Sequence, residues 1–141
     1  MKETFLAGRI LLGGYLLFAG SHHFTQATAM ADLTARQGVP LPMAAVLVAG
    51  FLLLIAGVTF ILGVAPRIGI AALVLFLVPV TLIMHPFWRE DGMRRMTDLI
   101  NFTKNVGLLG SALMFSAIPE PWPYSVGSHG HLRPVEPLAR R

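Results

Sequence analysis

The sequence contains no cysteine among its 141 residues. This absence excludes disulfide bonds, thiol catalysis, cysteine-ligated iron–sulfur clusters and covalently attached c-type haem. Any redox function would therefore need a bound cofactor, a quinone or a partner protein. The sequence shows no cofactor-binding motif, and no spacing such as His-Glu-x-x-His predicts a metal site. We assign no catalytic residue and no metal ligand from it.

Charged residues are scarce too, at 13% of the chain against about 25% in an average soluble domain, whereas 55% of the residues are hydrophobic. Such a deficit is expected of a chain that mostly faces lipid. The 11 Lys and Arg residues outnumber the 7 Asp and Glu residues. Because these basic residues are spread between apolar runs, we expect a lipid bilayer with anionic headgroups as the partner, and not nucleic acid.

The run Leu41–Ala65 has no ionisable side chain. As a helix rising about 1.5 Å per residue it would be roughly 37 Å long, enough to cross a hydrocarbon core of about 30 Å. A water-soluble helix needs a polar face, and this run has none. It therefore predicts a transmembrane helix over residues 41–62.

The first 31 residues allow two interpretations. Lys2 and Arg9 precede an apolar run, and Ala27-Thr-Ala29 resembles a cleavage site, as in a secretory signal. The alternative is a first membrane helix over residues 5–23. We prefer the helix, because it makes an even set with three later helices.

Two further apolar stretches predict helices over residues 66–85 and 101–118. Pro79 lies inside the first of them and is expected to kink the helix without breaking it. The chain is thus predicted to be an all-α integral membrane protein, with a four-helix bundle in residues 1–118.

The segments between and after these helices are expected to be irregular. Residues 25–40 are interpreted as a short connection, and residues 89–98 as an aqueous loop or a short surface helix. Residues 119–141 contain many prolines and are predicted to be a flexible, solvated tail. Within this tail, Trp122 and Tyr124 are expected to lie at the membrane interface.

Four antiparallel helices would place alternate ends on the same side of the membrane. The side opposite the N-terminus would then gather the candidate ligand-binding residues, which are His22, His85, Trp88, Lys104 and Asn105. Neutral imidazoles can ligate metal or haem iron, or hydrogen-bond a quinone carbonyl. A polar pocket with aromatic walls at membrane depth suits a quinone. The alternative is that the histidines cap their helices and that His85-Pro-Phe-Trp88 is an aromatic anchor.

Arg9 lies four residues into the first apolar segment. It either snorkels to the headgroups or has a structural or ligand-binding role inside the membrane. Close helix packing is expected at two pairs of small residues, Ala45 with Ala49 and Gly107 with Ser111. Lys and Arg are nearly balanced between the two sides, so the charges do not decide the orientation.

The order and spacing of several motifs resemble the DoxX family of small four-helix bacterial membrane proteins, from Arg9 to about Ile118. The motifs are Arg9-Ile-Leu-Leu-Gly13, Phe18-Ala-Gly20-Ser-His-His23-Phe24, Gly38-Val-Pro-Leu-Pro42, Ala49-Gly50, Gly57, Gly63, Arg67, His85-Pro-Phe-Trp88, Lys104-Asn105 and Gly110. Members of the family often have a glutamate soon after the Ala-Gly of the second helix, which would be a possible acidic partner for Arg9. Leu53 stands at that position here.

The resemblance implies a multi-pass protein of the bacterial plasma (inner) membrane with both termini in the cytoplasm. It also implies a membrane subunit of a quinone-linked redox assembly, with a soluble oxidoreductase as a partner. Two other functions stay open at this point, a small transporter and a membrane scaffold without catalytic activity. Against a transporter, four helices are few and no acidic residue lies in the middle of an apolar segment.

Overall fold

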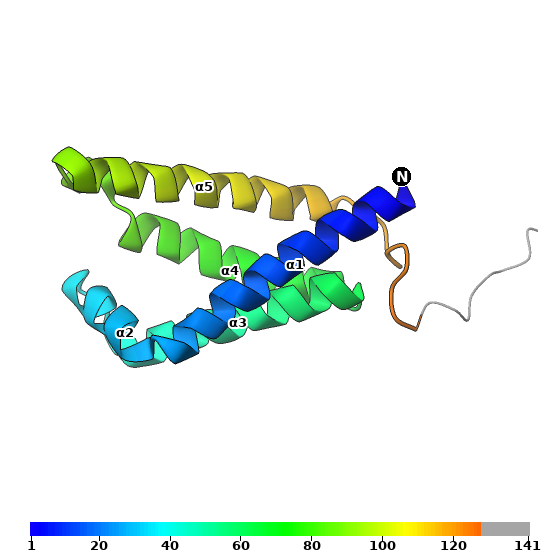
Figure 1. Cartoon of the computed structure of the whole chain (residues 1–141), viewed down its shortest axis with the longest axis horizontal. Coiled ribbons are helices and arrows are strands. Elements are labelled where there is room, and N and C mark those ends of the chain that lie inside the picture. The colour runs from blue at the N-terminus through cyan, green and yellow to red at the C-terminus, as the bar shows by residue number, and fades with distance from the viewer. Residues whose placement is uncertain (128–141) are drawn as a thin grey trace, which may run out of the picture.

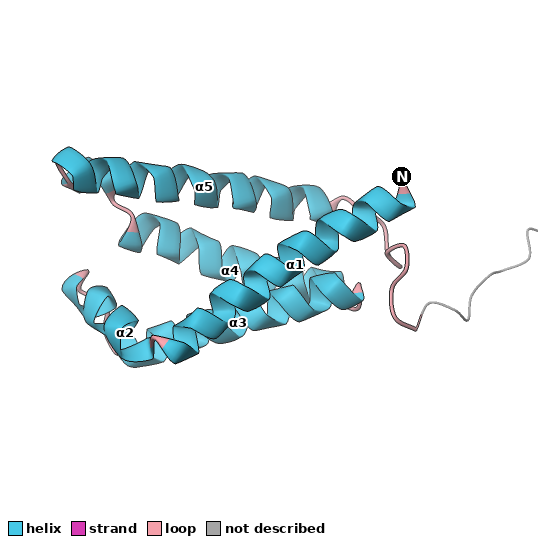
Figure 2. Cartoon of the chain, in the orientation of Figure 1, coloured by secondary structure: helices cyan, strands magenta, loops and turns pink. Residues whose placement is uncertain are grey.

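The computed structural model describes residues 1–127, which are helical throughout their regular parts and contain no strand (Figures 1 and 2). The all-α prediction is therefore confirmed. The elements are α1 (Lys2–Thr25), α2 (Ala27–Arg36), α3 (Pro42–Leu62), α4 (Pro66–Met84), the 3-10 turn η1 (Phe87–Arg89) and α5 (Gly92–Ser116).

Three segments in this part of the chain are long and apolar enough to cross a membrane. They are α1, α3 and the segment Pro66–Arg89, which consists of α4 and η1. The second half of α5 is apolar as well, but its first half contains charged residues, including Arg94, Arg95 and Asp98. The helices therefore have the composition of a membrane protein that crosses the bilayer more than once.

The helices pack in a continuous order. α1 lies on α3, α3 on α4 and α4 on α5, while the short α2 packs on α3 (Figure 1). The buried core lies mainly between α3 and α4, around Leu53, Phe60, Leu73 and Leu77. At one end of the molecule α1 and α5 also meet, where the rings of Phe5 and Phe115 are 5.9 Å apart.

Glycines bring the backbones of α1 and α3 into direct contact. A Cβ atom added at Gly13 would lie 2.9 Å from the carbonyl oxygen of Gly57, and one at Gly57 would lie 2.9 Å from that of Gly13. About two turns further along α1, a Cβ atom at Gly20 would lie 3.1 Å from the carbonyl oxygen of Gly50. The close packing expected at Gly107 and Ser111 was wrong, because no atom of another segment lies within 4 Å of the Cβ position of Gly107. Ala45 and Ala49 line a cavity instead.

Two segments that were expected to be irregular are largely helical. α2 occupies most of the expected connection over residues 25–40. It forms because Ala31 and Thr34, one turn apart, are buried, while the polar side of the helix stays exposed. α5 begins at Gly92, so residues 92–98 are the first turns of a long helix and not a separate loop.

Residues 119–127 form a strap across one end of the helices, which corrects the expectation of a solvated tail from residue 119. Trp122 is 1% exposed and packs against the rings of Phe5, Phe60 and Phe115, with centroids 5.2 to 5.8 Å away. The amide of Val126 donates to the carbonyl of Leu62 at 3.0 Å and so caps α3. The rest of the predicted flexible tail, residues 128–141, lies outside the described residues.

Gly57→Ala is expected to destabilise the protein by about 1 to 3 kcal/mol, because the new methyl group would meet Leu17 and the backbone of Gly13. Gly107→Ala is the matched control. Its Cβ would meet open space, so we expect no loss and a gain of about 0.5 to 1 kcal/mol from helix propensity. Unfolding of the two variants in detergent would measure this difference, and equal losses would contradict the backbone contact.

Trp122→Ala is expected to lower the free energy of unfolding by about 3 to 5 kcal/mol, because it empties the aromatic cluster under the strap. Trp88→Ala removes the same side chain from a position that is 52% exposed, so its effect should be clearly smaller. Thermal unfolding of both variants tests the strap. A larger loss for Trp88→Ala would show that residues 119–127 do not pack as described.

Candidate functional site

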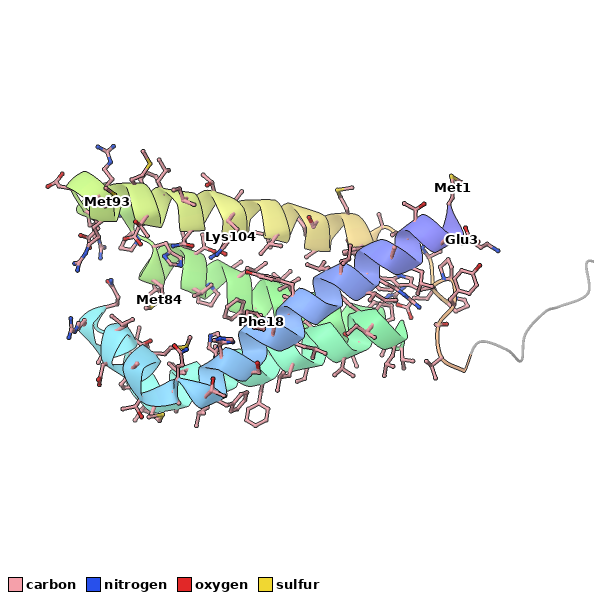
Figure 3. The ribbon with its side chains drawn as sticks, viewed as in Figure 1. Met1, Glu3, Phe18, Met84, Met93 and Lys104 are labelled. Atoms are coloured by element: carbon pink, nitrogen blue, oxygen red, sulfur yellow. The ribbon has the colours of Figure 1, made fainter. Side chains whose placement is uncertain are left out.

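An apolar cavity of about 510 Å³ lies between α2, α3 and α4, next to the C-terminal end of α1. Most of its wall is aliphatic and comes from Met30 and Leu33 of α2, Val46 to Leu52 of α3 and Leu75 to Met84 of α4. Met84 lies at the end of α4 that faces α2, at the opposite end of the molecule from Met1 and Glu3 (Figure 3). The polar side chains of the wall are His23, Thr34 and His85.

His23 is held in place by both of its neighbouring helices. Its Nδ1 atom donates to the carbonyl of Ala19 at 2.9 Å, because a carbonyl can only accept. Its ring stands edge-on to Phe76 of α4, with the centroids 5.9 Å apart. Gly50 of α3 leaves room for it, since a Cβ atom there would lie 2.9 Å from the Cβ of His23. The backbone contact of α1 with α3 therefore positions this imidazole at the cavity.

His85 lies at the C-terminal end of α4, where Pro86 stops the helix. Its Nδ1 atom is 3.2 Å from Oδ1 of Asp98 in α5. The side chains of His85 and Asp98 are 22% and 14% exposed, so this pair is partly shielded from water. Neither the aspartate nor the pairing was a candidate from the sequence, because residues 89–98 were expected to be an aqueous loop or a short surface helix, separate from the last membrane helix.

Of the five ligand-binding candidates from the sequence, His85 lines the cavity. His22 does not: its ring packs at a tilt against that of Phe18, with the centroids 4.4 Å apart, and its Nδ1 donates to the carbonyl of that residue. The remaining three lie on η1 and α5, outside the cavity wall: Trp88, Lys104 and Asn105.

Trp88 and Lys104 make contacts within η1 and α5. Trp88 packs against Phe87 and Phe102 and is 52% exposed. Lys104 is exposed, and its Nζ donates to Asn101 at 3.1 Å. Asn105 is buried, at 7% exposure.

Arg9 lies at the other end of the molecule, beneath the strap. It is 1% exposed, so it does not snorkel outward. Its Nη2 atom donates to the carbonyl of Tyr124 at 2.7 Å, while Nε and Nη1 have no hydrogen-bond partner among the described residues. A side chain at Gly63 would collide with the guanidinium group, so the α3–α4 turn must be glycine there. Gly63 also has a φ of 67°, which glycine adopts without strain.

A glutamate at position 53 would not reach Arg9 in this arrangement. Leu53 lies beside Gly20, whereas Arg9 lies beside Gly63. Ten residues of α3 separate these positions, which is about 15 Å along a helix.

Arg9 is instead covered by the strap, where the Tyr124 hydroxyl also donates to Glu3 at 2.9 Å. That bond raises the pKa of Tyr124, because a tyrosinate would lose it and face the carboxylate.

Two parts of the cavity were missed from the sequence. The first is His23, which differs from the chosen His22 by one step of about 100° around α1. The second is the wall from α2, whose residues Met30, Leu33 and Thr34 follow the spacing of one helical face. That spacing was visible, but it was outweighed by the glycine and prolines that follow it.

A protein-family model described as DoxX matches residues 4–86, more than half of the chain. The match includes all but the first two residues of α1, the whole of α2 to α4 and every residue of the cavity wall, and it ends before α5 and the strap. No curated protein and no solved structure matches the chain.

Proposed function

The chain belongs to the DoxX family of membrane proteins, and on that premise we propose that it binds an amphipathic, quinone-like ligand in the cavity between α2, α3 and α4. In this role it is a membrane subunit of a redox assembly and has no turnover of its own. The observation that supports the proposal is an apolar cavity with two imidazoles in its wall, His23 and His85.

The cavity has the size and chemistry that such a ligand requires. Its volume of about 510 Å³ lies within the range of small-molecule sites, which is about 300 to 1,000 Å³. The aliphatic wall suits an isoprenoid or acyl tail, and the imidazoles can hydrogen-bond a polar headgroup. The histidines come from the ends of α1 and α4, where the apolar segments end and a headgroup can lie at the boundary of the membrane.

The electrons would come from a partner protein. The chain has no cysteine for an iron–sulfur cluster, so the proposal assigns the electron donor to a soluble oxidoreductase. The exposed surface nearest the His85 end consists of η1 and the first turns of α5, where Trp88 and Met93 are exposed beside Arg94 and Arg95. A partner that docks there would lie close to the headgroup.

We further propose that α1, α3, α4 and α5 each cross the bacterial plasma membrane and that both termini are cytoplasmic. An even number of crossings is supported by the position of the strap, since Tyr124 bonds to Glu3 and Trp122 packs on Phe5. The end of the molecule with His85, Asp98 and η1 would then face the opposite side.

The topology is testable with paired reporters fused at two positions, after Gly127 and within residues 89–92. A reporter active only in the cytoplasm should be active after Gly127 and inactive at residues 89–92, because the two lie at opposite ends of the helices. Activity at both positions, or at residues 89–92 alone, would contradict the proposed arrangement.

Filling the cavity should abolish ligand binding. Ala49→Phe places a ring inside the wall of the cavity, whereas Ala44→Phe, five residues earlier on α3, places the same ring on an exposed position. The affinity of the purified proteins for a decyl-substituted benzoquinone should fall by about tenfold or more in Ala49→Phe, because the new ring displaces apolar contacts of the ligand. The affinity should not change in Ala44→Phe. Unchanged binding in Ala49→Phe would contradict a ligand site in this cavity.

A further inference from the structure

The hydrogen bonds of the two cavity imidazoles indicate which redox form of a ligand the cavity would prefer, an inference that rests on the proposed function. We propose that the cavity selects the hydroquinone form of its ligand over the quinone form, because the Nδ1 bonds of His23 and His85 leave the Nε2 atom of each ring as an acceptor in the cavity wall. Asp98 is then a positioning residue that acts through His85.

The first acceptor follows from the backbone of α1. The Nδ1 atom of His23 must hold a hydrogen in order to donate to the carbonyl of Ala19, at 2.9 Å. In a neutral imidazole only one nitrogen holds a hydrogen, so Nε2 is left with a free lone pair. The edge-on contact with Phe76 and the close approach at Gly50 restrict rotation of the ring.

The second acceptor follows from α5. Oδ1 of Asp98 accepts a hydrogen bond from Nδ1 of His85 at 3.2 Å, which again leaves Nε2 of the neutral ring as the acceptor. A carboxylate cannot donate, so it excludes the other tautomer of the neutral ring. His85 also lines the cavity, so both histidines offer the ligand the same hydrogen-bonding character.

Thr34 is the third polar side chain of the wall and does not reverse this character. Its hydroxyl hydrogen is used within α2, where it donates to the carbonyl of Met30 at 2.8 Å. The side chains of the wall therefore accept hydrogen bonds and do not donate them. A hydroquinone has two hydroxyl donors that match such a wall, whereas a quinone has only carbonyl acceptors, which would leave the imidazole nitrogens unpaired.

The size of the preference follows from ordinary hydrogen bonds. One such bond corresponds to roughly a fivefold change in affinity, so two should favour the hydroquinone by about 25-fold. Tighter binding of the reduced form raises the midpoint potential of the bound couple, by about 30 mV for each factor of ten in a two-electron reaction. The cavity would thus hold the reduced ligand and make it a weaker electron donor.

The test measures binding of a decyl-substituted benzoquinone and of its hydroquinone to the full chain in detergent, at mildly alkaline pH. We expect the hydroquinone to bind about 25-fold more tightly. His23→Gln and His85→Gln should each reduce this ratio by roughly fivefold, because an amide can also donate to the quinone. His22→Gln is the matched control, since its neighbour on α1 lines the cavity and His22 does not, and its ratio should not change.

Asp98→Asn separates positioning from folding. The amide can donate to Nδ1 of His85 as well as accept from it, so Nε2 is no longer held as an acceptor. The midpoint potential of the bound couple should therefore fall relative to the unchanged chain, while the protein still binds the quinone. A loss of stability alone would not move that potential.

The outcomes are distinct for the two proposals. Equal affinity for both forms, tighter binding of the quinone, or an equal effect of His22→Gln would overturn the selection and leave the ligand site in place. An unchanged potential in Asp98→Asn would overturn the role of that residue. If neither form binds to the unchanged chain, both the selection and the proposed function are refuted.

Discussion

The contact between the backbones of α1 and α3 is the constraint on which the rest of the structure depends. Helices in lipid gain little from burying apolar side chains, so close approach and good packing must hold them together. Gly13 against Gly57 and Gly20 against Gly50 provide that approach. The same contact turns His23 toward the cavity at one end of α1 and places Arg9 under the strap at the other.

This contact also gives a structural reason for the glycines in the family motifs. Four of the glycines in the motifs lie in the contact of α1 with α3, and Gly63 makes room for Arg9. These residues specify how the helices meet, and fold alone does not determine function. The features that suggest chemistry are different ones, namely the imidazoles of the cavity wall and their hydrogen-bond partners.

Much of the fold could be predicted from the sequence, because a run such as Leu41–Ala65 has no polar face and so has few alternatives to a membrane helix. Contacts between distant segments could not be predicted. The burial of Trp122 depends on three rings from other helices, and the pairing of His85 with Asp98 depends on α5 beginning early. The sequence could not show that His23 and not His22 lines the cavity, because adjacent residues on a helix face different neighbours.

The central claim is that the cavity between α2, α3 and α4 holds an amphipathic ligand with its headgroup near His23 and His85. Photolabelling in native membranes with an azido-substituted quinone, followed by mass spectrometry of the peptides, tests it most directly. The account predicts labels on the walls of the cavity in α3 and α4, displaced by excess unlabelled quinone. Labels spread over the lipid-facing surface, with no displacement by quinone, would contradict it.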